Sequence, residues 1–206
     1  MFKPSSFVRC LALGAALVPL SSTAQECKAT NAAYEISQDE ANQLYNCLAE
    51  RLAALPENVT GIPGVPDYRD WEVVSTAPLP SATHGSMLVN HIVSPEAAAL
   101  YKQWEQMSGK KFPPGAILAK ESLMIDSDGN TSPGPLFLME KTAAGTAPDT
   151  DDWIYSRIFT DGRIQRTLGP GSANLDFCHD CHAATIDQFD AMFFPPERYR
   201  IETSQD

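Results

Sequence analysis

The chain has 206 residues and is strongly acidic, with 26 Asp and Glu residues against 15 Lys and Arg and a formal net charge of −11 at pH 7. This charge disfavours nucleic acid and anionic membranes as partners, because both are themselves negatively charged. The length suits one domain with a sizeable hydrophobic core.

Residues 1–24 have the features of a bacterial secretory signal peptide. Two basic residues are followed by an apolar run that is too short to span a bilayer, and small residues at 22–24 supply a cleavage site. No later apolar stretch is long enough for a membrane helix. We therefore expect a periplasmic protein without a membrane span, whose mature chain begins near Gln25.

Residues 25–67 are expected to form a helical extension and a linker. Ser37 and Glu40 have the spacing of a capping box, and the apolar residues after them recur at helical spacing, which predicts a helix over 38–55. Several proline and glycine residues then mark the linker.

Residues 68–206 are expected to form the main domain, in which sheet predominates. The predicted strands cover residues 70–77, 86–94, 116–125, 135–143 and 152–160. Asp-Gly pairs at 128–129 and 161–162 are typical of hairpin turns. Helices are predicted over 95–108 and 183–193. Together these elements predict an α+β fold, a mostly antiparallel sheet with packed helices.

Residues 178–182 have the sequence Cys-His-Asp-Cys-His, near the C-terminus. Cys-x-x-Cys-His is the attachment sequence of a c-type haem: the thiols add to the haem vinyl groups, and the histidine becomes an axial ligand of the iron. The motif therefore predicts one covalent haem c, held by Cys178, Cys181 and His182. A dithiol or a zinc site would use the same thiols, but zinc needs two further ligands and the sequence has no second cluster of suitable spacing.

The remaining cysteines are expected to form a disulfide. Cys10 leaves with the predicted signal and the haem motif uses two others, so that Cys27 and Cys47 are left for each other in an oxidising compartment. This bridge would tie the start of the mature chain to the first helix.

In this chain the haem motif comes late in the sequence, after the predicted strands. In small electron-transfer cytochromes c the motif comes early, and in cytochromes c′ the protein is helical. The combination resembles the cytochrome P-460 family. Residues 68–76 resemble the family's opening strand, and residues 112–121 resemble its Phe-x-x-Gly-(x)4-Lys-Glu segment. Residues 178–195 resemble its haem motif and closing helix. The resemblance covers residues 68–196 and leaves out the helical extension.

This resemblance implies that Lys120 bonds through its side-chain nitrogen to a meso carbon of the haem. Only a neutral amine can form this bond, and burial beside a haem lowers the pKa of a lysine. Strand alternation puts Lys120 on a largely apolar face and Glu121 on the opposite face. A solvent-facing lysine on a half-exposed strand is the alternative.

His182 is expected to be the proximal ligand, with its second ring nitrogen donating to an acceptor that the sequence does not identify. The resemblance implies an open sixth position, and five side chains could close it instead: Met87, Met124, Met139, His84 and His91. Hydroxylamine-oxidising members of the family resemble one another in carrying an arginine on the second strand, whereas residues 87–89 here are apolar. That difference favours a dry cavity suited to a diatomic gas.

Three functions are consistent with these features. The favoured one is oxidation of hydroxylamine, nitric oxide or both at a five-coordinate, Lys120-linked haem, with electrons passed to a periplasmic acceptor such as a cytochrome c. Lys120 and Glu121 are the candidate catalytic residues, and Glu140 is the other nearby carboxylate that could act as acid or base. The alternatives are nitric oxide binding without a cross-link, as in sheet-type cytochrome c′-beta relatives, and electron transfer by a six-coordinate haem. The resemblance also implies a homodimer formed through the sheet.

Overall fold

The computed structural model describes residues 27–54, 62, 65–169 and 171–202. The predicted signal segment and most of the predicted linker lie outside these residues. In the described part of the chain, no helix has both the length and the apolar character needed to cross a membrane.

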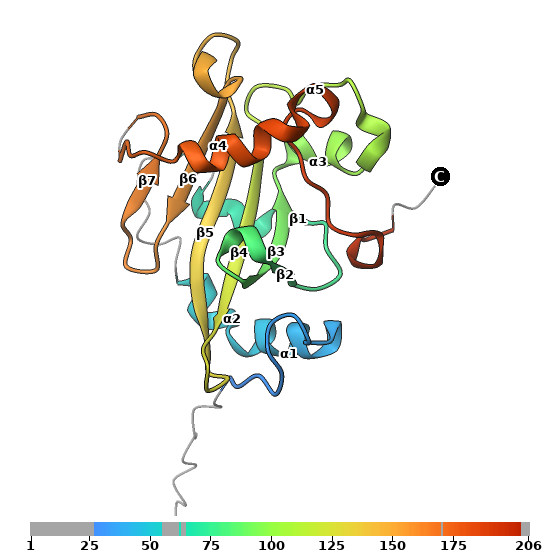
Figure 1. Ribbon diagram of the computed structural model, residues 1–206, viewed down its shortest axis with the longest axis vertical. Coiled ribbons are helices and arrows are strands. Elements are labelled where there is room, and N and C mark those ends of the chain that lie inside the picture. Colours follow the sequence, from blue (N-terminus) through green and yellow to red (C-terminus); the bar gives the residue numbers. More distant parts are fainter. Residues whose placement is uncertain (1–26, 55–61, 63–64, 170, 203–206) are drawn as a thin grey trace, which may run out of the picture.

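Seven strands of the described chain form one sheet (Figure 1). Their bounds are β1 Glu72–Val73, β2 Leu79–Ser81, β3 Met87–Val93, β4 Ile117–Ile125, β5 Thr131–Lys141, β6 Trp153–Ile158 and β7 Ile164–Arg166. The strand order is β1-β3-β4-β5-β6-β7, and β2 also pairs with β3. All of these pairings are antiparallel, which confirms the predicted α+β fold.

The five predicted strands are all present, and both predicted hairpin turns connect neighbouring strands. Gly129 and Gly162 have φ of 81° and 83° in these turns, a conformation that glycine adopts without a steric penalty. At Gly129 a Cβ would also lie 2.6 Å from the carbonyl oxygen of Ala29, so the close approach requires glycine. The sequence does not predict β2 and β7, because three residues are too few to show an alternating pattern.

The α-helices of the described chain are α1 Gln38–Cys47, α2 Ala49–Ala53, α3 Pro95–Tyr101, α4 Asp176–His182 and α5 Ile186–Phe189, and short 3-10 helices lie between some of the elements. The Ser37 half of the predicted capping box is confirmed, because the Ser37 side chain accepts a hydrogen bond from the backbone N–H of Glu40 at 3.1 Å. The Glu40 carboxylate instead accepts from the backbone N–H of Thr30 at 2.6 Å. Each long predicted helix is shorter than expected. The first is interrupted at Leu48. The second ends at Tyr101, ahead of a 3-10 helix that begins at Trp104 with a φ of 51°. The last ends before Asp190, which has a φ of 49°.

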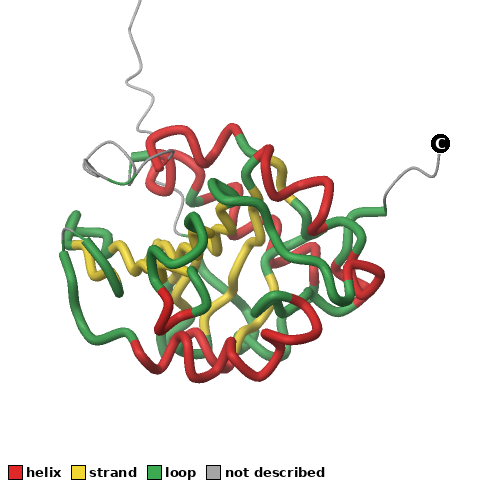
Figure 2. Tube along the Cα trace, turned by 90° about the horizontal axis from the view of Figure 1, so that it is seen from above, coloured by secondary structure: helices red, strands yellow, loops and turns green. Residues whose placement is uncertain are grey.

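Different helices cover the two ends of the sheet. In Figure 1, α4 and α5 lie across its upper end, and α1 and α2 lie at its lower end. Figure 2, which views the molecule from above, shows helical segments on both sides of the strands. The register places His91, Lys120 and Phe137 side by side on β3, β4 and β5. All three side chains line the cavity beneath α4, which fixes the functional face of the sheet.

The N-terminal extension shares a core with the sheet. Cys27 and Cys47 form the predicted disulfide, and the backbone N–H of Thr131 donates to the carbonyl oxygen of Cys27 at 2.9 Å. Buried leucines of the extension and of the strands pack in one cluster: Leu44, Leu48, Leu52, Leu79, Leu88 and Leu123. The extension is therefore packed against the lower end of the sheet.

Candidate functional site

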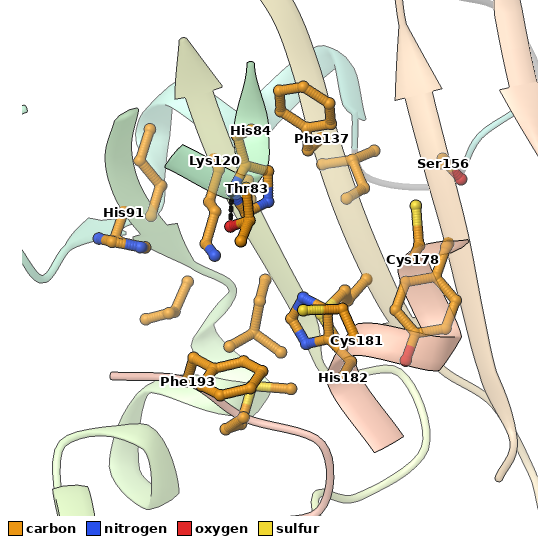
Figure 3. Close-up of a pocket in the computed structure, with 18 of the residues that line it drawn as sticks. Thr83, His84, His91, Lys120, Phe137, Ser156, Cys178, Cys181, His182 and Phe193 are labelled. Atoms are coloured by element: carbon orange, nitrogen blue, oxygen red, sulfur yellow. Dashed lines mark hydrogen bonds between the residues drawn. The ribbon is translucent and has the colours of Figure 1, made fainter. Parts of the chain in front are cut away.

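Helix α4 carries the Cys-x-x-Cys-His motif across the functional face of the sheet. Residues three and four apart lie on one side of a helix, so Cys178, Cys181 and His182 all face the same cavity. Figure 3 shows these side chains on one side of the cavity and Lys120, with His84, on the other. The cavity is lined mainly by apolar side chains from the strands and from α4, as is usual for cofactor sites.

His182 is held as a metal ligand would need to be. Its Nδ1 lies 2.6 Å from the carbonyl oxygen of Ala191, and since a carbonyl only accepts, Nδ1 carries the proton and Nε2 keeps its lone pair. Burial, and then the nearby charge of Lys120, lower the pKa of His182 to about 4. The imidazole is therefore neutral at physiological pH, the form that binds a metal. Ala191 is the acceptor that the sequence does not identify.

Lys120 projects from β4 into this cavity, with its amino group between the sheet and α4 (Figure 3). Burial lowers the pKa of the amine to about 8, so that about a tenth of it is neutral at pH 7. The side chain is half-buried because it borders open cavity. Among the described residues it has neither an ion-pair partner nor a side-chain hydrogen bond. The predicted position of Lys120 on an apolar, pocket-lining face is thus observed.

Glu121 points to the opposite face of β4, as the strand alternation predicts, and does not line the cavity. Its carboxylate is buried and accepts hydrogen bonds from Tyr45 Oη at 2.5 Å, from Tyr68 Oη and from the Arg69 guanidinium, with which it forms an ion pair. Glu140 also lies outside the cavity lining, paired with Arg166 at 2.7 Å. Neither carboxylate therefore lies in the cavity that the haem motif faces.

Two imidazoles make the cavity more polar than residues 87–89 predict. His84 Nδ1 lies 2.8 Å from Ser81 Oγ, and burial, followed by the charge of Lys120, lowers the pKa of His84 to about 3. His91 is only 6 % exposed, and its Nδ1 has no hydrogen-bond partner among the described residues. Burial lowers the pKa of His91 well below its ordinary value. Leu88 packs in the core shared with the extension and does not line the cavity. The cavity lining is still mostly apolar, with these two neutral imidazoles as polar groups.

Of the five side chains that could close the sixth position, His84, His91 and Met139 line the cavity, whereas Met87 and Met124 are absent from its lining. The sequence does not single out Tyr155, a buried cavity residue whose hydroxyl has no partner among the described residues. An aromatic residue on a predicted strand gives no signal that separates it from ordinary core.

The two motif cysteines are present as free thiols, and Cys178 is half-buried while Cys181 is exposed. The described residues contain no group of three or more His, Cys, Asp or Glu side chains placed to hold a metal ion directly. A zinc site would therefore lack ligands in this part of the chain. Two thiols beside a neutral histidine, all on one wall of the cavity that Lys120 enters from the sheet, fit a haem.

An antiparallel sheet with a late Cys-x-x-Cys-His helix across its face defines a class of haem-binding proteins. The family model for cytochrome P460 matches residues 65–194, well over half of the chain. The chain therefore belongs to the cytochrome P460 family, which confirms the resemblance described above and implies that it binds haem. A search of curated proteins returned no match.

Proposed function

We propose that this chain is a periplasmic haem c protein of the cytochrome P460 type that oxidises hydroxylamine, nitric oxide or both, with Lys120 bonded to its haem. The observation that carries the proposal is the placement of Lys120 in the same cavity as the attachment motif. An ammonium group without a partner in a largely apolar cavity is unfavourable. A neutral amine that becomes covalently bonded removes that cost.

Cys178 and Cys181 are the residues that would form the thioether bonds, and His182 Nε2 would bind the iron. The hydrogen bond from His182 Nδ1 to Ala191 keeps the ring in the tautomer that leaves Nε2 available. Covalent attachment takes place in the periplasm, where the predicted signal would deliver the chain. The family and the motif both support this location.

Lys120 is the nucleophile in the proposed cross-link. Its neutral form would supply the lone pair for the bond to a meso carbon, and that N–C bond would replace one N–H and one ring C–H bond. This change removes two electrons and two protons, so it requires a two-electron oxidant such as a peroxide. The lowered pKa of Lys120 supplies the neutral amine at physiological pH.

A bound haem supplies an iron that can bind a small nitrogen species and accept electrons from it. On the protein side, His84 is the polar group best placed to orient such a molecule, because Ser81 occupies its Nδ1 and Nε2 is the nitrogen left to serve the cavity. The Phe137 ring packs edge-on against the His84 ring at 5.0 Å and restricts its motion. The electrons would leave to a periplasmic acceptor such as a cytochrome c.

Nitric oxide binding without turnover is the second candidate function. The aromatic side chains of Phe137 and Phe193, together with the neutral imidazoles, give a mostly uncharged cavity that suits a diatomic gas. This alternative requires that Lys120 stays unbonded.

Turnover assays on the haem-loaded protein test the proposal, with hydroxylamine or nitric oxide as the substrate and a one-electron dye as the acceptor. We expect Lys120→Met to lower the rate about tenfold or more, roughly 1.4 kcal/mol in the barrier. The matched control Lys111→Met removes an exposed lysine and should leave the rate unchanged. A wild-type protein that binds nitric oxide reversibly and turns over neither substrate would support the alternative function instead.

A further inference from the structure

The turn that orients His182 has an unusual backbone. Asp190 and Ala191 follow α5 with φ of 49° and 71°, so two consecutive residues other than glycine adopt the left-handed conformation. Such residues are uncommon there, and the strain persists only where the surroundings hold it. The carbonyl that accepts the His182 hydrogen bond belongs to Ala191, the second of these two residues. The orientation of the predicted proximal ligand thus depends on a strained turn.

A buried ion pair fixes the first residue of the turn. Lys141 Nζ donates to Asp190 Oδ1 at 2.8 Å, with side chains that are 8 % and 0 % exposed. The second carboxylate oxygen, Oδ2, accepts from the backbone N–H of Phe112 at 2.9 Å. Both oxygens of Asp190 are therefore occupied, and the residue cannot rotate without losing a partner in the protein interior.

Lys141 is itself held from the other side. Its ammonium group donates to the carbonyl oxygen of Asp151 at 3.0 Å and lies 4.8 Å from the centre of the Trp153 ring. Because Lys141 ends β5 and pairs with Trp153 on β6, its backbone is part of the sheet. The pair therefore connects the rigid sheet to the strained turn above it.

We propose that Lys141 and Asp190 are positioning residues that hold the turn at Asp190 and Ala191 and thereby set the hydrogen bond of His182. The inference rests on the proposed function, in which His182 binds the haem iron. A strong hydrogen bond from Nδ1 makes the imidazole a more basic ligand. Relaxation of the turn would weaken that hydrogen bond, weaken the iron–histidine bond and raise the reduction potential.

The test uses the haem-loaded protein and compares wild type with the double variant Lys141→Met/Asp190→Asn. The double variant removes both buried charges together, because leaving one unpaired would be far more destabilising than removing both. The single variant Asp190→Asn, which keeps the shape of the side chain, is measured in parallel in case the double variant does not fold. The readouts are the iron–histidine stretching frequency of the ferrous protein and its reduction potential.

We expect the stretching frequency to fall and the potential to rise in both variants. Adding Ala191→Gly to the double variant should return both readouts toward wild type, because glycine adopts a φ of 71° without strain. The control variant Glu140→Gln/Arg166→Met neutralises another ion pair, between β5 and β7, whose members are not the bonding partners of Asp190 or Ala191. It should lower the melting temperature without moving either readout.

Wild-type readouts in a folded Asp190→Asn or double variant would overturn the inference, since the pair would then support only the fold. Equal shifts in the control variant would overturn it as well. A wild-type protein with no iron–histidine band would overturn the proposed function together with this inference, so the two failures are distinguishable.

Discussion

Lys120 and His182 share one cavity, and burial is the largest cause of the lowered pKa of each side chain. Burial disfavours the charged form of a base, so both groups become better electron-pair donors near neutral pH. A neutral imidazole can bind a metal, and a partly neutral amine can form a bond to carbon. At the residue scale, burial in the cavity therefore favours the neutral form that the proposed role of each side chain requires.

The sequence predicts on which face of a strand a residue lies, but not which residues its side chain bonds to. Alternation alone places Lys120 and Glu121 on opposite faces, as observed. The partners of Glu121 come from the extension and from residues 65–70, and only the folded chain brings these segments together. Similarly, the carbonyl of Ala191 reaches His182 through a left-handed turn that no local pattern indicates.

The lowered pKa of Lys120 predicts a specific titration. In the haem-free protein, the ε-carbon NMR signal of Lys120 should titrate near pH 8, whereas that of an exposed lysine titrates near its ordinary value of about 10.4. The neutral amine increases as the pH rises through the folded pKa, so cross-linking should accelerate about tenfold between pH 6 and pH 7 and level off above about pH 8. Lys120→Arg assigns the signal. Titration near pH 10 would contradict the account.

β4 is the element that organises the site. One of its faces presents Lys120 to the cavity, and the other presents Glu121 to a buried group of hydroxyls and a guanidinium. A strand fixed by hydrogen bonds on both sides to β3 and β5 positions the lysine more rigidly than a loop would. The Glu121 contacts add a further anchor between this strand and the extension.

The sequence predicts the longer strands, whose alternating pattern covers many residues. It does not predict the helix ends, which depend on tertiary contacts. The five longer strands and both Asp-Gly turns follow from alternation and turn chemistry. The predicted helices at 38–55, 95–108 and 183–193 are interrupted or shortened, because periodicity shows which residues face a core but not where the backbone turns. The helix α4 was missed because seven residues dominated by cysteine, histidine and aspartate carry no apolar periodicity.

The disulfide at the lower end of the sheet should contribute to stability without contributing to the site. We expect the double variant Cys27→Ser/Cys47→Ser to lose about 2–5 kcal/mol of the free energy of unfolding, because the bridge restricts the unfolded chain. Urea denaturation measures this loss. The absorption spectrum of the bound haem should not change, since α1 and α2 pack at the opposite end from α4 (Figure 1). Loss of the haem spectrum in a folded variant would show that the extension supports the site.

At the scale of the whole molecule, the N-terminal extension packs at one end of the sheet and the candidate haem site lies at the other. The extension packs at the lower end in a leucine-rich core. At the other end, α4 carries the haem motif, and Lys120 and the two neutral imidazoles line the cavity beneath it. Family membership over residues 65–194 covers the strands and α4, but not α1 and α2. The strongly acidic composition, with a net charge of −11, would complement a basic electron acceptor in the proposed function.

The absorption spectrum of the ferrous, ligand-free, haem-loaded protein tests the central claim most directly. The account predicts a Soret band far to the red of ordinary haem c in the wild type, since a bond from Lys120 alters the electronic structure of the macrocycle. It predicts an ordinary high-spin haem c spectrum in Lys120→Met and the red-shifted band in Lys111→Met. An ordinary spectrum in the wild type would contradict the cross-link and leave a gas-binding cytochrome as the better interpretation.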